Sequence, residues 1–407
     1  MASLGGPHIV TDGLVLSLDA ANDKSFRGEP TTNLVTAPSV NGLSPIVLTY
    51  LGQEDGWEKY SISGTFVGGT YPYIMNIDAV AFTAGVQYTT RCTMRTNVLN
   101  KFNYFGTIGV NYVNLPLSIS GVNRVITNTD GSTTVSREGF AYQNTTTQPG
   151  FLHTNPINNT TFNPSTDFIW VKDVQVEQKP YATPFVNGTR GTTVATGGGW
   201  ADRTGNSNHG ELVNGPTFDS ANGGSIVFDG VNDFIDCGNS SSLNFGTGSF
   251  TINCWFRPST LQAGGDFPAL IEKSTGDFTS PSAGVTGWIL LYFTNGNQYV
   301  FRLGDSSTTV NNLSFPLTVT NDNIWKNLAV TVSPTTLIGY YNGVIVGSTT
   351  RTLTGSVNTS TNLNIGRWRA FTRELNTNIS QVQIYNRALT AQEVEQNYNA
   401  TKTRFGL

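Results

Sequence analysis

Trp200-Ala-Asp-Arg-Thr-Gly-Asn-Ser-Asn-His-Gly210, followed by Ser225-Ile-Val-Phe-Asp-Gly-Val-Asn-Asp-Phe234, decides the fold class of this chain. The first stretch is a polar turn, because Asp, Asn, Ser and Gly favour turn conformations. The second is a short apolar strand that ends in an Asp-Gly turn. Together they predict the start of an antiparallel ladder that fills the second half of the sequence.

The residues after this stretch contain many short apolar segments separated by Gly, Asn and Pro. Tyr341-Asn-Gly-Val344 is the strongest hairpin signal, since Asn-Gly suits a two-residue type I′ turn. Thr390 and Glu393 form a capping box before the one convincing helix, which is short and terminal. The predicted strands are 225–228, 234–237, 250–257, 269–273, 288–293, 298–303, 325–332, 337–341, 344–349, 362–365 and 379–385. This spacing, with no helical period, predicts an all-β antiparallel sandwich.

The first half of the chain has a similar texture. Gly13-Leu-Val-Leu-Ser-Leu-Asp-Ala-Ala-Asn22 predicts one strand and a turn. From residue 29 onward, further strands are predicted at 60–67, 87–95, 102–112, 132–142 and 168–177. The Gly-rich segment 188–199 has the composition of a linker. Two sandwiches with little helix are therefore expected.

Composition excludes several classes of function. Charged residues make up 12% of the 407 residues, against roughly 25% in an average soluble domain. A net charge of −4, with no basic stripe, gives no footprint for nucleic acid. The apolar runs are far shorter than the ~20 residues that span a bilayer, so no membrane insertion is expected. The first residues lack the basic start and apolar core of a secretory signal, so a protein that works outside a cell would leave it by another route, such as lysis.

The sequence resembles the laminin-G-like (concanavalin-A-like) jelly-roll family in several places. Leu14 to Asn22 and Trp200 to Asn206 look like two consecutive family elements. Further matching segments are Phe250 to Phe256, Trp325 to Val332, Tyr340 to Gly343, Asn364 to Arg367 and Ile379 to Val394. The long interval between the first two elements implies an insertion, which costs little at an exposed loop.

The insert is similar to carbohydrate-binding-module jelly rolls at Asn33-Leu34, Trp57 to Tyr60 and Trp170 to Glu177. The predicted domains are thus residues 1–26, the first strand of a laminin-G-like domain; 27–190, an inserted carbohydrate-binding-module-like sandwich; and 191–407, the remainder of the laminin-G-like domain. The fold class is all-β, with two antiparallel jelly-roll β-sandwiches, one inserted into a loop of the other, and a short C-terminal helix.

The resemblance implies a function, because many such sandwiches lie on the surface of tailed phages. It implies a virion surface protein, such as a capsid decoration, fibre or appendage, with lectin-like domains that attach to host glycans. The expected partners are other virion proteins and a host surface polysaccharide or glycan, and the resemblance implies synthesis in the host cytoplasm and release by lysis. A purely structural cement or collar protein is the alternative, and a polysaccharide depolymerase is a third hypothesis.

An enzyme is not expected. A glycosidase needs two carboxylates about 5–9 Å apart, and the Glu-x-Asp-x-x-Glu motif of β-glucanases with this architecture does not occur. Glu177, Glu211, Glu272 and Glu374 are isolated in the sequence and are expected to be solvated or turn carboxylates.

Aromatic side chains flanked by polar groups are the candidates for sugar binding, because a sugar ring stacks on an aromatic face. The candidates in the insert are Trp57, Tyr60, Tyr71, Tyr73 and Tyr104. In the laminin-G-like part they are Trp288, Tyr292, Arg367, Trp368 and Arg369. Trp368 leads this set, since charged neighbours on both sides make full burial of its loop costly. Core packing is the alternative for every one of these aromatic residues.

Two interpretations are open for Asp229, Asp233 and Asp236. Carboxylates clustered on loops suit calcium, whereas Asp229-Gly230 and Asn232-Asp233 are also turn-forming pairs. Calcium is the only cofactor that the sequence suggests.

A homo-oligomer, with a trimer favoured by the resemblance to phage fibres, is expected because weak sugar contacts gain avidity when repeated. Residues 1–11 and 401–407 are too short to fold alone, so they are expected to be ordered by a neighbouring subunit or by the virus particle, with Phe405 and Leu407 as apolar anchors.

Overall fold

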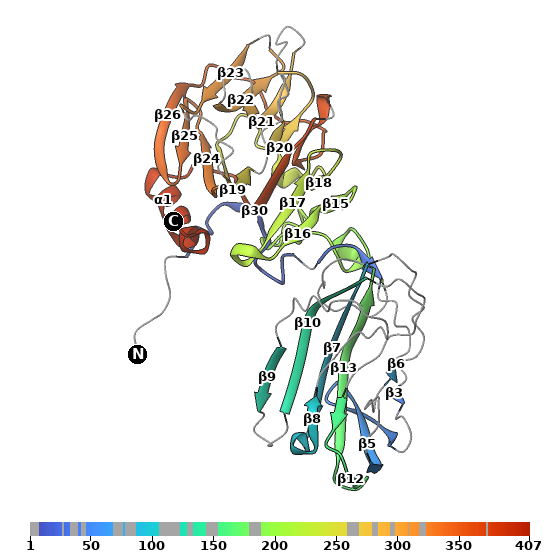
Figure 1. The fold of residues 1–407 in the computed structure, drawn as a ribbon. Helices are drawn as coiled ribbons and strands as arrows, with labels where there is room; N and C mark the ends of the chain where they lie inside the picture. Colours follow the sequence, from blue (N-terminus) through green and yellow to red (C-terminus); the bar gives the residue numbers. More distant parts are fainter. Residues whose placement is uncertain are drawn as a thin grey trace. The chain divides into compact units, whose positions relative to one another are not determined.

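The chain folds into two compact units in the computed structural model (Figure 1). Residues 1–30 and 191–407 form the first unit, and residues 31–190 form the second. The structure describes residues 8–26, 28–32, 40–41, 46–67, 76–77, 87–105, 123–127, 133–143, 154–178, 189–258, 268–278, 284–293, 298–307, 309–316, 323–371 and 373–407.

The first unit contains two large antiparallel sheets. One has the strand order β16-β17-β30-β19-β24-β25-β26, with β1 also paired to β30. Its strands are β1 (Leu14–Asp19), β16 (Thr217–Asp219), β17 (Ser225–Asp229), β19 (Phe250–Pro258), β24 (Lys326–Val332), β25 (Thr336–Tyr341), β26 (Val344–Thr350) and β30 (Asn376–Tyr385). The other has the order β15-β18-β27-β20-β21-β22-β23. Its strands are β15 (Glu211–Val213), β18 (Phe234–Asp236), β20 (Ala269–Ser274), β21 (Thr286–Phe293), β22 (Gln298–Asp305), β23 (Val310–Ser314) and β27 (Asn364–Ile365). A two-stranded ribbon joins β28 (Arg367–Trp368) to β29 (Arg373–Glu374).

Strand alternation builds the core between these sheets. On β19, Phe250, Ile252 and Phe256 face the main core cluster, whereas Trp255 faces the opposite side of the sheet and joins a separate aromatic cluster. The all-β antiparallel class predicted from the sequence is confirmed. The short strands β15, β16 and β23 were not predicted, because each has only three to five residues and little apolar character.

The segment that follows residue 190 is anchored, so its interpretation as a linker was wrong. Thr193 caps the 3₁₀ helix η2 (Val194–Thr196). The side chain of Trp200 is fully buried, and its main chain forms isolated antiparallel β-bridges with Phe26 and with Gly210. Gly199 has a φ of +73°, and a Cβ atom there would lie 2.9 Å from the Gly210 carbonyl oxygen. These contacts hold the backbone in place.

The C-terminal helix α1 (Ala391–Thr401) begins at the predicted capping box of Thr390 and Glu393. The 3₁₀ helix η8 (Lys402–Phe405) follows it and packs on the chain's own first unit. Phe405 is buried, and Arg404 forms a 2.7 Å ion pair with Asp19. At the other end, the Val10 amide donates to Asn397 Oδ1 at 2.8 Å. The expectation that a neighbouring subunit orders these segments is therefore wrong for residues 8–11 and 401–407.

The second unit is built around one seven-stranded antiparallel sheet, with the order β12-β5-β13-β7-β10-β9 and β4 paired to β5 (Figure 1). Its strands are β4 (Val47–Glu54), β5 (Trp57–Phe66), β7 (Gln87–Thr96), β9 (Asn123–Thr127), β10 (Thr133–Gln143), β12 (Thr160–Phe162) and β13 (Phe168–Glu177). Two-stranded pairs add β2 (Thr31–Thr32), β14 (Thr189–Arg190), β3 (Val40–Asn41), β6 (Asn76–Ile77), β8 (Phe102–Phe105) and β11 (Thr154–Pro156), and the 3₁₀ helix η1 (Leu99–Lys101) precedes β8. Across the described parts of the chain, no helix has the length and apolar character needed to cross a membrane.

Candidate functional site

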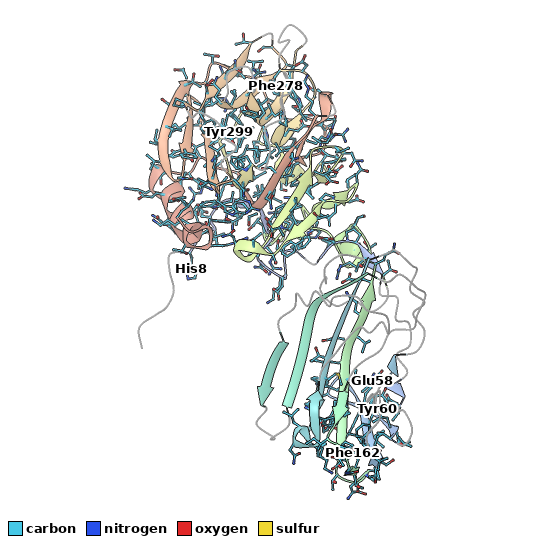
Figure 2. All side chains as sticks on the ribbon, viewed as in Figure 1. His8, Glu58, Tyr60, Phe162, Phe278 and Tyr299 are labelled. Carbon is cyan, nitrogen blue, oxygen red and sulfur yellow. The ribbon has the colours of Figure 1, made fainter. Side chains whose placement is uncertain are left out.

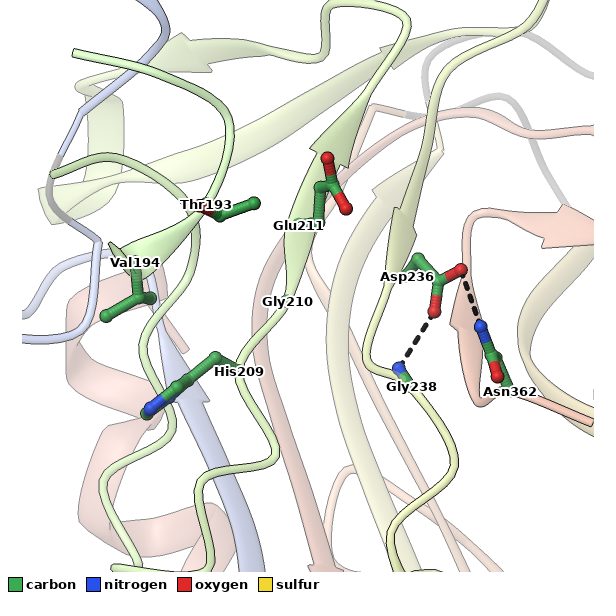
Figure 3. Close-up of a pocket in the computed structure, with 8 residues that line it drawn as sticks. All are labelled: Thr193, Val194, His209, Gly210, Glu211, Asp236, Gly238 and Asn362. Carbon is green, nitrogen blue, oxygen red and sulfur yellow. Dashed lines mark hydrogen bonds between the residues drawn. The ribbon is translucent and has the colours of Figure 1, made fainter. Parts of the chain in front are cut away.

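A pocket opens in the first unit at the strands β15 and β18 (Figure 3). Its volume of 310 Å³ is at the lower end of the roughly 300–1,000 Å³ that small-molecule sites occupy. It is lined by Thr193, Val194, His209, Gly210, Glu211, Asp236, Gly238 and Asn362.

Two carboxylates line the pocket from neighbouring strands. Glu211 on β15 is the direct register partner of Asp236 on β18, so both side chains lie on one face of the sheet. Residues directly opposite each other in an antiparallel pair have Cβ atoms about 5 Å apart, and like charges at that position are unfavourable. A ligand that donates hydrogen bonds to both groups would reduce this repulsion.

The two carboxylates differ in how fully they are bonded. Asp236 Oδ1 accepts from the Gly238 amide at 2.8 Å, and its Oδ2 accepts from Asn362 Nδ2 at 2.9 Å. Glu211 is exposed, and its Oε1 accepts from Thr192 Oγ1 at 3.0 Å. No described residue donates to Glu211 Oε2, so this oxygen can accept a hydrogen bond from a ligand.

His209 and Asn362 add further polar groups. His209 Nδ1 accepts a hydrogen bond from the Asp202 amide at 3.1 Å, so the neutral imidazole carries its proton on Nε2. Asn362 uses its amide nitrogen for Asp236, and its main-chain oxygen accepts from Arg369 Nη2 at 2.9 Å. Arg369 therefore supports the pocket wall. The lining combines acceptors and a donor, which is the polar chemistry that sugar hydroxyls require.

The polar turn after Trp200 positions this pocket. The buried Asp202 carboxylate accepts from the Ser17 amide at 3.0 Å and from the Asn208 amide at 3.1 Å. Asn208 Nδ2 in turn donates to the Val15 carbonyl oxygen at 2.7 Å. The turn is thereby fixed to β1, and His209, Gly210 and Glu211 follow it directly.

Three predicted sugar-binding aromatic residues of the first unit are core residues instead. Trp288 and Tyr292 face the main core from β21, and Trp368 is fully buried beside Ile289. The expected exposure of Trp368 was wrong, because its charged neighbours are paired. Arg367 Nε lies 3.5 Å from Glu374 Oε1, and Arg369 Nε lies 4.0 Å from Glu272 Oε1.

The insert candidates belong to the second unit, whereas the pocket residues belong to the first. Trp57 is half-buried on β5. Tyr60 is 5% exposed, and its hydroxyl donates to Glu58 Oε2 at 2.8 Å; both residues are labelled in Figure 2. The side chain of Tyr104, on β8, lies outside the described residues, as do Tyr71 and Tyr73 entirely.

The three aspartates proposed for calcium do not gather around one point. Asp229 Oδ1 accepts from the Val231 amide at 2.8 Å, which is turn chemistry. Asp233 Oδ2 accepts from the Asp229 amide, and burial raises the pKa of Asp233 to about 6. Asp236 belongs to the pocket. The described residues contain no group of three or more His, Cys, Asp or Glu that could hold a metal ion.

Three of the four carboxylates expected to be solvated are buried. Glu272 is fully buried and accepts from Ser274, Asn364 and the Arg369 amide. Glu177 is 1% exposed and accepts from Thr31 Oγ1 at 2.7 Å. Glu374 is also buried, close to Arg367. Hydrogen bonds offset the cost of burial for Glu272 and Glu177, and the ion pair with Arg367, at 3.5 Å, does so for Glu374.

Comparisons with known proteins agree with the fold of the first unit. Residues 229–395 match a family model described as the concanavalin A-like lectin/glucanases superfamily. No curated protein matches the chain. Similar solved structures include the binding domain of Paraclostridial Mosquitocidal Protein 1, with 21% identity, a TM-score of 0.43 and coverage of 49% of each chain.

Another similar structure is the binding domain of botulinum neurotoxin serotype G, with 18% identity, a TM-score of 0.40 and coverage of 49% of this chain and 47% of that one. The chain thus spans about half the length of these structures. The laminin-G-like resemblance seen in the sequence is confirmed at the level of the fold: residues 229–395 form a sandwich similar to the concanavalin A-like lectins and glucanases.

Proposed function

We propose that this chain is a glycan-binding protein of a tailed-phage virion surface, and that the pocket of the first unit binds a sugar of the host. The observation that carries the binding proposal is the cross-strand pair of Glu211 and Asp236, next to His209 and Asn362, in a pocket of 310 Å³. Sugar hydroxyls are donors and acceptors at once, so they can donate hydrogen bonds to the two carboxylates and accept one from His209 Nε2.

Binding without turnover is the activity that we propose. Both oxygens of Asp236 are already bonded, to the Gly238 amide and to Asn362, so this carboxylate is fixed as an orienting acceptor. Glu211 supplies Oε2, to which no described residue donates, as the acceptor for a ligand hydroxyl.

A glycan array followed by calorimetric titration tests the binding proposal. Glu211→Gln should weaken the best array ligand about tenfold, because a charge-assisted hydrogen bond becomes a neutral one. Glu395→Gln removes the same charge from an exposed position of α1 and is the matched control. Equal affinities for the two variants would refute the pocket as the site.

The virion location rests on the resemblance of the sequence to phage surface sandwiches and on its low charge. Antibody against the chain should label particles in electron microscopy. Unlabelled particles would refute this part of the proposal and leave the pocket experiment unaffected.

A purely structural role is the second candidate function, and exposed apolar edge residues favour it. Val344 and Ile345 are 65% and 52% exposed on β26, which is the last strand of its sheet order. Edge strands of this kind pair readily with other chains. Sedimentation of the full chain should show a homo-oligomer, and Ile345→Lys should shift it toward the monomer. Only the structural candidate predicts both this shift toward the monomer and the absence of any ligand on the glycan array.

A further inference from the structure

One face of the sheet in the second unit carries rings and cations in alternation. The strands β5, β13 and β7 are neighbours in this sheet, and each contributes side chains from alternate positions. We name this set the ring–cation ladder; in spatial order it consists of Lys172, Trp57, Arg95, Trp170, Lys59 and Phe168.

Strand register explains why these side chains meet. Trp170 on β13 is directly opposite Lys59 on β5 and directly opposite Arg95 on β7. Trp57 lies two residues before Lys59, and Phe168 and Lys172 lie two residues to either side of Trp170. All six therefore project from the same face, while the intervening Tyr60, Ile169 and Val171 are buried on the other.

The contacts form an unbroken series. Lys172 Nζ lies 4.4 Å from the centroid of the Trp57 ring, and the Arg95 guanidinium carbon lies 5.4 Å from the same ring. Arg95 is also 4.2 Å from the Trp170 ring. Lys59 Nζ lies 5.3 Å from Trp170 and 4.6 Å from Phe168. Each distance is within the roughly 6 Å of a cation–π contact.

The ladder has more positive charge than its own carboxylate neutralises. Glu54 on β4 is the register partner of Trp57 on β5. Its carboxylate forms a 2.7 Å ion pair with Lys59 and accepts a hydrogen bond from Trp170 Nε1 at 3.4 Å. Neither Arg95 nor Lys172 is hydrogen bonded to a carboxylate among the described residues, and Arg95 Nε is buried without a partner. Three cations against one carboxylate leave two positive charges on a chain whose net charge is −4.

We propose that the ring–cation ladder binds an acidic polysaccharide, one whose sugars carry carboxylates. This proposal deepens the proposed function, on which it rests, by assigning a second site and a ligand class. The half-buried faces of Trp57 and Phe168 provide stacking surfaces for sugar rings. Arg95 and Lys172 provide donors for the carboxylates beside them.

Charge complementarity selects this occupant over a neutral glycan. Stacking alone would accept any sugar ring, and unpaired cations next to the rings add affinity only for an acidic one. Single-stranded nucleic acid also combines stacking with negative charge, but it requires a basic groove that tracks many phosphates. The ladder offers two cations, Arg95 and Lys172, that are not hydrogen bonded to a carboxylate in the described part of the chain, and these match individual carboxylates of a ligand.

The test measures binding of the full chain to oligogalacturonate, hyaluronan and oligosialic acid fragments, each with its carboxyl-reduced counterpart. At least one acidic fragment should bind, at least about tenfold more tightly than its reduced form, with quenching of tryptophan fluorescence and weakening by salt. Arg95→Gln/Lys172→Gln should weaken this binding about tenfold or more. Trp57→Ala should weaken both the acidic and the reduced fragment.

The matched control is Lys24→Gln/Arg203→Gln, which removes two positive charges from exposed positions of the first unit and should leave the affinity unchanged. Equal binding of acidic and reduced fragments, equal effects of the two double variants, tighter binding of single-stranded DNA than of any acidic fragment, or binding of none would each overturn the proposal. Glu211→Gln should not affect acidic binding by the ladder. Failure of the pocket in the first unit is thereby distinguished from failure of the ladder.

Discussion

Phe405 stacks on Trp255 with ring centroids 4.2 Å apart and an angle of 23° between the ring planes. The same phenylalanine lies 4.7 Å from the Trp325 ring. Trp255 is on the outer side of its sheet, so the C-terminal segment covers a tryptophan that would otherwise face water. The end of the chain is thus part of the first unit.

Phe405→Ala should lower the free energy of unfolding of the first unit by about 3 kcal/mol, since a buried ring is lost and a cavity remains. Chemical denaturation followed by tryptophan fluorescence measures this change. Leu407→Ala, at a residue that is 40% exposed, is the control and should change stability by less than about 0.5 kcal/mol. Equal stabilities of the two variants would contradict the packing of η8.

Trp368→Ala should destabilise the first unit by about 3–5 kcal/mol, because Trp368 is fully buried beside Ile289 and Leu291. Trp57→Ala in the second unit should cost much less stability, since Trp57 is half-buried. Denaturant titration of both variants gives the comparison. A Trp368→Ala protein with wild-type stability would support the surface role predicted from its charged neighbours.

Glu393 makes the start of α1 sensitive to acid. Its two oxygens accept from Arg387 at 2.7 and 2.9 Å, and this hydrogen bonding lowers the pKa of Glu393 from 4.5 to about 2. A carboxyl with a lowered folded-state pKa contributes stability above its unfolded value and loses it as the pH falls. The stability difference between wild type and Glu393→Gln should therefore be constant above about pH 5 and shrink between pH 4.5 and 2. A difference that does not change over this range would contradict the ion pair.

Gly210→Ala should disturb the pocket directly. A Cβ atom at this position would lie 2.4 Å from Ile235 Cγ2, so β15 or the buried Ile235 must shift. We expect a loss of about 1–3 kcal/mol in unfolding free energy and weaker sugar binding. Gly276→Ala is the control, because its nearest atom would be 3.9 Å away. Wild-type stability and binding of Gly210→Ala would show that this close approach is not needed.

The sequence predicted the fold class well because alternating apolar residues and Asn-Gly turns are local signals. β13 (Phe168–Glu177) was predicted with its observed ends, and the helix α1 begins at the predicted capping box of Thr390. Anchoring of the Gly-rich segment was missed, since it depends on Gly199 fitting against the distant Gly210.

The pocket could not be predicted, because its residues are gathered by strand pairing between distant segments. Glu211 meets Asp236 only through the β15–β18 register, and Asn362 arrives from another part of the chain. The burial of Trp368 was missed for the same reason. Its neighbour Arg369 pairs with Glu272, which is far away in the sequence, and its neighbour Arg367 pairs with Glu374 only because the strands β28 and β29 lie side by side. The ring–cation ladder had one local sign, the alternation of Trp57 with Lys59 and of Trp170 with Lys172.

The central claim is that this chain binds glycans, and a glycan array probed with the full wild-type chain tests it most directly. The account predicts reproducible binding to a defined class of surface sugars, reduced by Glu211→Gln or by Arg95→Gln/Lys172→Gln according to the site used. Absence of binding to every glycan on the array, by a protein that is correctly folded, would contradict the claim and favour the purely structural role.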